Sequence, residues 1–240
     1  MRTISVLILF LIFTTVAFSQ DQERILQKNF EAHNFSARKN ASGLLTTGHF
    51  IMSGTDLQVP FKLYQKRPDR IRIETSLFGM KVVQTYDGKK AWLLNPAQGM
   101  QAKEADGEDL EVIAMTTAIE GPFMLYKEKG YRMQYLGDQS FREKKVYLFR
   151  FLKTESEYLD IYINRQTYRV DAVRFTYERN GGRYSQVYRT GSYKQFDTGY
   201  FPTEIVAVIH GVEMTKIYVK DVKAKSALSD ELFKRPGVHP

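Results

Sequence analysis

Histidine side chains are the first place to look for chemistry in this chain, and their spacing predicts no site. His33, His49, His210 and His239 are far apart, and no two have the spacing of metal ligands. Each is therefore expected to be an ordinary surface or core residue. The chain contains no cysteine, which excludes disulfides, thiol catalysis and cysteine metal sites.

A cluster of carboxylates is the second candidate for chemistry. Its members are Glu104, Asp106, Glu108, Asp109 and Glu111. Two of them could be imagined as the acid pair of a glycosidase. However, these residues lie at the start of a helical pattern. Acidic residues are common at a helix N-terminus, where they cap backbone N–H groups and the helix dipole stabilises their negative charge. The chain also lacks G-x-S-x-G, Walker-type and G-x-G-x-x-G motifs. We therefore expect no enzymatic activity, no cofactor and no metal.

The formal net charge of +8 permits several kinds of partner. Anionic lipid headgroups, acidic proteins and polysaccharides would all be attracted. Nucleic acid is not expected, because the lysines and arginines are spread along predicted strands instead of being clustered.

The N-terminal segment resembles a cleaved secretory signal. Arg2 provides a positive start, residues 4–13 are almost entirely apolar, and Ala17 and Ser19 are small residues of the kind that signal peptidase reads. The apolar run is shorter than the roughly 20 residues of a membrane-spanning helix. We expect cleavage between Ser19 and Gln20, export to the periplasm, and one domain over residues 20–240. Without a cysteine, the mature chain is not expected to carry an acyl anchor.

The elements that must position any site are mostly strands. Residues 22–38 have helical spacing of apolar side chains, and after Gly43 the period changes to two. Asp87-Gly88 and Asn180-Gly181 predict hairpin turns. We predict about eleven antiparallel strands in a sheet that curls or closes.

A second helix is predicted over residues 106–119. Its apolar residues cover more than one stripe, so it is expected to contact apolar surface on two sides. Two helices are too few to cover a flat sheet from outside, so we place both within the curve. Sequence alone leaves open whether this curve encloses an apolar cavity or a filled core.

Four segments together resemble the LolA/LolB family of bacterial lipoprotein carriers. Residues 65–69 read Q-K-R-P-D, and residues 86–96 read Y-D-G-K-K-A-W-L-L-N-P. Residues 121–125 and 232–237 resemble two further family segments. The resemblance is good over residues 57–126 and architectural over residues 131–225.

The resemblance implies a fold and a mechanism. The fold is a strongly curved, incomplete antiparallel barrel, mainly β, with helices forming a lid over a hydrophobic cavity. The family's carriers hold lipoprotein acyl chains there and ferry them to the outer membrane. Arg67 matches the arginine that bonds to lid backbone and keeps the empty carrier closed. On its own pattern, Arg67 could equally be a surface arginine at a strand end, and Trp92 a core residue.

We expect a defined set of apolar residues to line the cavity. They are Leu63, Ile71, Ile73, Val83, Trp92, Leu94, Leu110, Ile113, Met115 and Phe123. The expected partners are lipoprotein acyl chains or another lipid, together with membrane-bound donor and acceptor proteins, and the carrier itself is expected to be a monomer. The alternatives are a module that senses lipoproteins without transporting them, and a scaffold with a filled core.

Overall fold

The computed structural model describes residues 21–105, 121, 123, 124, 126–179 and 181–237. The expected signal sequence and the helix predicted over residues 106–119 lie outside the described residues. Within the described part of the chain, no helix is long and apolar enough to cross a bilayer.

Thirteen strands form one antiparallel sheet, in the order β6-β5-β4-β3-β2-β1-β15-β14-β11-β10-β9-β8-β7. Strands β12 and β13 form a separate hairpin. The bounds are β1 Gly43–Met52, β2 Gln58–Lys66, β3 Arg70–Leu77, β4 Met80–Tyr86, β5 Ala91–Leu94, β6 Lys103–Glu104, β7 Arg132–Phe141, β8 Lys144–Leu152, β9 Tyr158–Asn164, β10 Val170–Arg179, β11 Gly182–Thr190, β12 Tyr193–Phe196, β13 Gly199–Pro202, β14 Glu204–Ile209 and β15 Val212–Lys225. Residues 21–32 are helical, and α2 (Ser36–Lys39) and the 3₁₀ helix η1 (Asp230–Phe233) follow in chain order.

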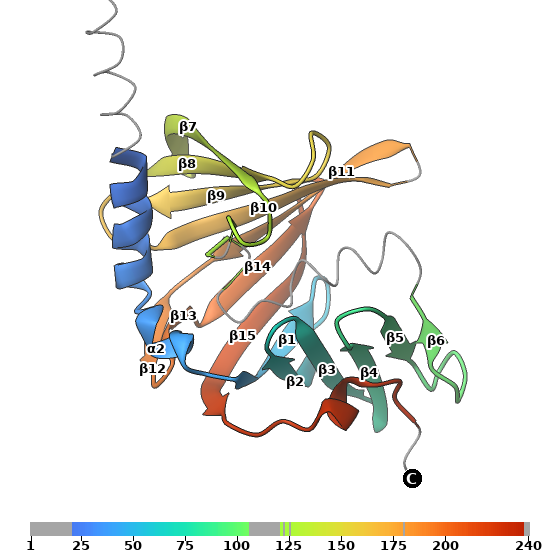
Figure 1. Cartoon of the computed structure of the whole chain (residues 1–240). Helices are drawn as coiled ribbons and strands as arrows, with labels where there is room; N and C mark the ends of the chain where they lie inside the picture. Colours follow the sequence, from blue (N-terminus) through green and yellow to red (C-terminus); the bar gives the residue numbers. More distant parts are fainter. Residues whose placement is uncertain (1–20, 106–120, 122, 125, 180, 238–240) are drawn as a thin grey trace, which may run out of the picture.

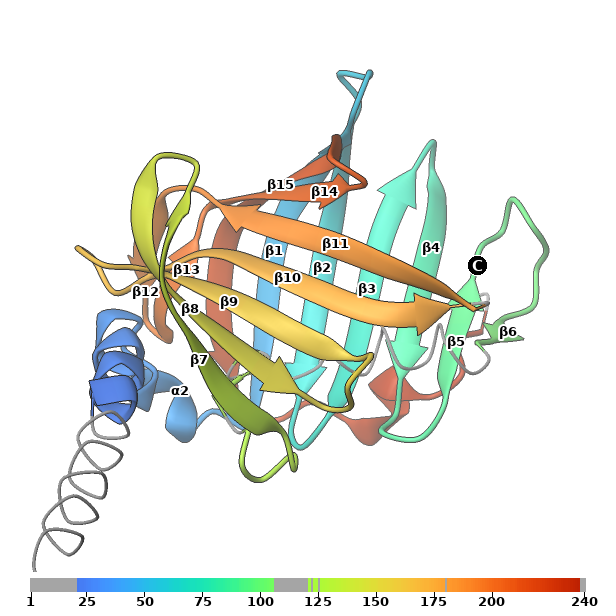
Figure 2. The same cartoon turned by 90° about the horizontal axis from the view of Figure 1, so that it is seen from above.

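The sheet is strongly curved and does not close. Strands β1–β6 form one half and β7–β11 the other, and β14 and β15 join them (Figure 1). Seen from above, β8–β11 cross over β1–β4 (Figure 2). Strands β6 and β7 remain the two free edges. The mainly β, curved and incomplete antiparallel architecture expected from the sequence is confirmed.

The strand count differs from the expected number of about eleven. Strand β1 was not recognised, because its residues 44–48 do not alternate cleanly between apolar and polar types. It pairs with both β2 and β15, and Gly48 permits this crowding. A Cβ at Gly48 would lie 2.0 Å from the carbonyl oxygen of Tyr218. Strand β11 ends at Thr190, and β12 begins at Tyr193 in the separate hairpin.

The inner face of the sheet can be followed by register, because paired residues in antiparallel strands point to the same side. In β7–β10 this face carries Phe149, Phe151, Ile161 and Ile163, which are 0% exposed. The helix over residues 21–32 packs on these residues through Ile25 and Leu26. It stands at the left of the molecule in Figure 1, coloured blue. The N-terminal helix therefore packs against the inner face of β8 and β9 from one side of the sheet.

The predicted N-terminal helix is interrupted before α2. Residues 33–35 form a turn, and Asn34 has a φ of 49°, in the left-handed region that ends a helix. The break lets the chain turn from the helix into β1.

Candidate functional site

An apolar groove lies on the inner face, in the half of the sheet that the N-terminal helix does not cover. It has a volume of about 510 Å³, within the range of pockets that hold small-molecule ligands. Thirteen described residues line it: Thr46, Phe50, Phe61, Leu63, Gln65, Ile73, Thr75, Phe201, Pro202, Ile205, Thr215, Ile217 and Val219. None of these side chains is ionisable, so the groove suits an uncharged hydrocarbon.

Five consecutive strands form the floor of this inner groove. They are β3, β2, β1, β15 and β14, in sheet order. Strands lie about 4.8 Å apart, so the floor is about 19 Å wide. The apolar residues recur every second position, as in Phe61 and Leu63 of β2 or Thr215, Ile217 and Val219 of β15. The groove is therefore a direct product of strand alternation on a curved sheet.

Two of the residues expected to line a cavity, Leu63 and Ile73, line the inner groove. Ile71 shares their face and lies next to them, fully buried in a cluster with Tyr86 and Ala91. Phe123 lies in the other half, with its ring centroid 5.5 Å from that of Phe151. Leu110, Ile113 and Met115 lie outside the described residues.

Val83, Trp92 and Leu94 lie on the opposite, outer face of the sheet. Register pairs Val83 with Leu94, and these three residues form a buried cluster with Ala102. They alternate with Gln84, which shares a face with the groove residue Ile73. The expectation that they line the inner cavity is therefore corrected, and Trp92 has the core-packing role that its pattern also allowed.

The cover on this outer face is the C-terminal strap, residues 226–237. Arg72 and Thr85 point to the outer face and donate hydrogen bonds to the carbonyls of Leu232 (3.0 Å) and Lys234 (3.2 Å). Arg235 in turn donates to the carbonyl of Ala102 at 2.9 Å. The segment over residues 232–237, singled out in the sequence, thus covers the outside of the sheet.

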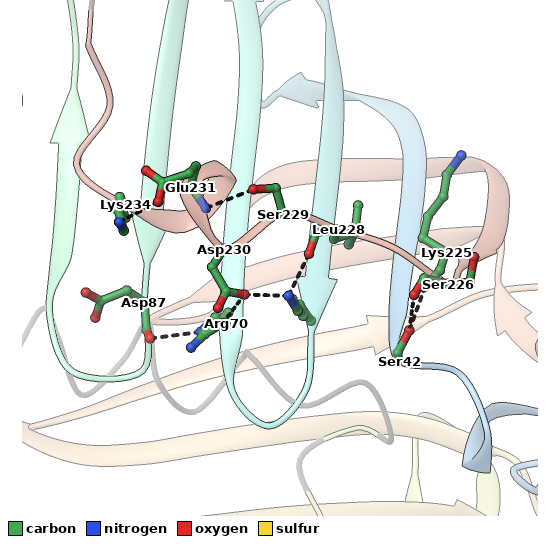
Figure 3. A network of polar contacts seen from close by, with 11 residues as sticks. Ser42, Arg70, Asp87, Lys225, Ser226, Leu228, Ser229, Asp230, Glu231 and Lys234 are labelled. Carbon is green, nitrogen blue, oxygen red and sulfur yellow. Dashed lines mark hydrogen bonds and ion pairs between the residues drawn. The ribbon is translucent and has the colours of Figure 1, made fainter.

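Charged residues secure the start of the strap. Asp230 forms ion pairs with Lys66 and Arg70, and Arg70 also donates to the carbonyl of Asp87 at 3.2 Å, as Figure 3 shows for Asp230, Arg70 and Asp87. Lys66 donates to the carbonyl of Leu228 at 2.6 Å. The ion pairs lower the pKa of the Asp230 carboxyl. The turn after β2 is thereby connected to the C-terminal segment.

Arg67, in the same turn, points toward the N-terminal segment. Its Nε donates to the carbonyl of Ala41 at 2.7 Å, and its Nη2 to the carbonyl of Arg38 at 2.9 Å. The Arg38 carbonyl lies in α2 and also accepts a hydrogen bond from the N–H of Ala41 at 3.0 Å, and the Ala41 carbonyl lies just after α2. Burial lowers the pKa of Arg67 from its ordinary value. The turn over residues 66–67 therefore bonds to both terminal segments.

Two buried titratable residues lie beside these bonds. Burial lowers the pKa of Arg38 to about 9, so its guanidinium remains charged at neutral pH. Burial, and next the positive charge of Arg38, lower the pKa of His33 to about 3. The Nε2 of neutral His33 accepts a hydrogen bond from the backbone N–H of Val170 at 3.3 Å. His33 and Arg38 are structural neighbours here, and among the described residues no group of three or more acidic or histidine side chains could hold a metal ion.

Alternation in the sequence contained a signal for several groove residues that were not singled out. Phe61 and Ile205 stand in recognised strands, and Ile217 pairs with Ile205 across β14 and β15. Phe201 and Pro202 belong to the β12–β13 hairpin, which had no such pattern. Their place in the groove depends on how that hairpin folds over the sheet.

Comparisons with known proteins were made by sequence and by structure. No family model and no curated protein matches the chain. Among solved structures, a LolA superfamily protein from Nitrosomonas europaea has a TM-score of 0.59 at 14% identity, covering 85% of this chain and 96% of that one. An outer membrane lipoprotein-sorting protein domain from Vibrio parahaemolyticus has a TM-score of 0.58 at 16% identity, covering 88% and 95%.

A third similar structure is a DUF1329 family protein from Desulfovibrio piger, with a TM-score of 0.58 at 12% identity, covering 88% of this chain and 97% of that one. In each case nearly all of the solved domain is matched. The chain therefore has the LolA-like fold that the sequence resemblance implied.

Proposed function

We propose that this chain is a periplasmic carrier that shields the acyl chains of lipoproteins, or of a related lipid, in the inner groove and delivers them toward the outer membrane. The observation that carries the proposal is the groove itself, about 510 Å³ in volume and lined by described residues of which none is ionisable. Each buried methylene of an acyl chain contributes about 0.8 kcal/mol. A groove of this kind can hold such a chain out of water.

The contact between Arg67 and the N-terminal segment supports a carrier more than a scaffold with a filled core. Arg67 holds the N-terminal segment by two hydrogen bonds to carbonyls. Hydrogen bonds to charged groups contribute about 1.5–3 kcal/mol, a connection that thermal motion can open. The proposal places the mature monomer, residues 20–240, in the periplasm, where membrane-bound donor and acceptor proteins would load and unload it.

Binding is tested with a matched pair of variants. Residues 20–240 are produced in a bacterial periplasm, purified gently and analysed by native mass spectrometry for bound lipid or lipoprotein.

Ile217→Asp places a charge in the groove and is expected to lower affinity for a fluorescent fatty acid at least about tenfold. Val187→Asp makes the same change at a half-buried position on the outer face and is expected to leave binding unchanged. Wild-type protein that binds neither lipid nor probe would refute the proposal.

Delivery is tested separately. A synthetic triacylated lipopeptide is loaded onto the protein, and its transfer to acceptor vesicles is followed over time. Transfer faster than spontaneous exchange supports a carrier. Tight binding without any transfer would instead favour the sensing module that the sequence left open.

A further inference from the structure

One end of the inner groove is formed by the β12–β13 hairpin. Phe201 and Pro202 of this hairpin line the groove. Phe196 and Phe201 pack against the buried pair Leu44 and Val222 on the inner face. The hairpin forms its own two-stranded sheet, outside the thirteen-stranded one. Backbone hydrogen bonds join the base of the hairpin to the sheet, from Thr203 to Ser192 (2.7 Å) and from Val219 of β15 to Thr203 (3.0 Å). The contacts that hold its tip are therefore the ones that can set its position over the floor.

Arg38 makes two side-chain hydrogen bonds to the tip of this hairpin. Its Nε donates to the carbonyl of Thr198 at 3.0 Å, and its Nη2 to the carbonyl of Tyr200 at 2.8 Å. The guanidinium carbon of Arg38 lies 3.7 Å from the ring centroid of Phe201. Phe201 is one of the residues that line the groove. Arg38 is only 5% exposed. A guanidinium is rarely buried to this extent without a specific role for its fork of donors.

The hairpin also meets the backbone of the N-terminal segment directly. The N–H of Tyr200 donates to the carbonyl of His33 at 2.9 Å. Gly199 has a φ of 107°, and a Cβ there would lie 2.6 Å from the same carbonyl oxygen. Only glycine can adopt this conformation so close to the His33 carbonyl. Gly199 therefore allows the tip of the hairpin to contact residues 33–38. Arg67 holds the same segment from the other side through the carbonyl of Arg38.

We propose that the β12–β13 hairpin is an end wall that limits the length of the acyl chain in the groove, and that Arg38 is the residue that positions this wall. The inference rests on the proposed function and adds a basis for cargo selection. The terminal methyl group of a bound chain would stop at Phe201. Chains longer than this limit gain nothing from further methylenes, because the added groups stay outside the groove.

The test is a series of saturated fatty acids of increasing chain length, with affinity measured by displacement of a fluorescent fatty acid. Affinity is expected to rise about fourfold per added methylene and then reach a plateau. Phe201→Ala removes the wall and is expected to move the plateau to longer chains, with a gain of at least about fourfold for the first chain beyond the wild-type limit. Arg38→Met releases the hairpin and is expected to move or abolish the plateau.

Arg72→Met is the matched control. Arg72 also donates to a backbone carbonyl, that of Leu232, but it does so on the outer face. Its loss is expected to leave the plateau at the wild-type length. Hydrogen exchange gives a second readout: amides of residues 193–202 should exchange faster in Arg38→Met than in Arg72→Met.

The outcomes separate this inference from the proposed function. A wild-type plateau that stays at the same length in Phe201→Ala and in folded Arg38→Met would overturn the end wall and leave the carrier in place. If Arg38→Met does not fold, the result for Phe201→Ala decides. Wild-type protein that binds no fatty acid of any length would overturn both the proposed function and the end wall.

Discussion

The two halves of the inner face have the same alternating pattern of apolar residues, but they differ in what packs against them. Over β7–β10, the helix of residues 21–32 packs on the inner face together with Phe123 and Tyr126, and the central floor residues of β8 and β9 are buried. Over β1–β3, β14 and β15, Phe50, Phe61 and Ile217 remain half-exposed around a groove. A close-packed half provides stability, whereas apolar surface that the described residues leave exposed is available to a ligand. Among the described residues, close packing and exposed apolar surface are thus separated along one continuous sheet.

The largest expected effect is on the free energy of unfolding. It is tested by replacing one phenylalanine in each half of the inner face. Phe149→Ala in the filled half is expected to lower the free energy of unfolding by about 3–5 kcal/mol, because it leaves a cavity in a packed core. Phe61→Ala in the groove is expected to cost only about 1 kcal/mol and to weaken acyl-chain binding. Urea unfolding and fluorescent fatty-acid binding measure the two quantities. Equal destabilisation by both variants would show that the groove is part of the packed core.

Arg67→Leu tests the connection between the groove half and the N-terminal segment. Each of the two charge-assisted hydrogen bonds lost is worth about 1.5–3 kcal/mol, and under the proposed function both favour the closed, empty form. A bound fatty acid is therefore expected to dissociate roughly tenfold more slowly, as followed by transfer to vesicles. Arg70→Leu is the control, because Arg70 bonds to Asp87 and Asp230 instead. Identical dissociation rates in the two variants would exclude Arg67 as a latch.

Acid is expected to weaken the filled half first. The folded state holds His33 neutral down to a pH of about 3, its pKa there, whereas unfolded histidine takes up a proton near pH 6.5. Between these values the unfolded state binds more protons, so stability falls as pH falls, by up to about 1.4 kcal/mol per pH unit. His33→Gln should flatten this dependence in urea unfolding at pH 5 relative to pH 7. An unchanged slope would show that other groups dominate.

The smallest effect is expected on the outer face. Asp230→Asn removes the ion pairs with Lys66 and Arg70 at the start of the strap. Since the carboxylate is exposed, we expect a small decrease in Tm that disappears at high salt, and no change in fatty-acid affinity. A loss of affinity would mean that the strap, although outside the curve, influences the groove.

The sequence predicted those parts of the fold that depend on neighbours in the chain. The Asp87-Gly88 turn between β4 and β5, the alternation in β9 and the helix beginning near residue 22 are all present. Leu63 and Ile73 line the apolar groove, and a lipid in contact with them stays a prediction. Strand β1 was missed, because residues 44–48 do not alternate cleanly between apolar and polar types.

Alternation alone determined which residues of a strand share a face: Val83 with Thr85, or Leu63 with Phe61. It could not decide which face is the inner one, because a period of two looks the same from both sides of a sheet. Only the tertiary structure decided this, through the pairing of β1 with β15 and the strap that buries Val83, Trp92 and Leu94 from outside. The position of the β12–β13 hairpin was decided in the same way. The carbonyls of Thr198 and Tyr200 in this hairpin accept hydrogen bonds from the buried guanidinium of Arg38, some 160 residues earlier in the chain.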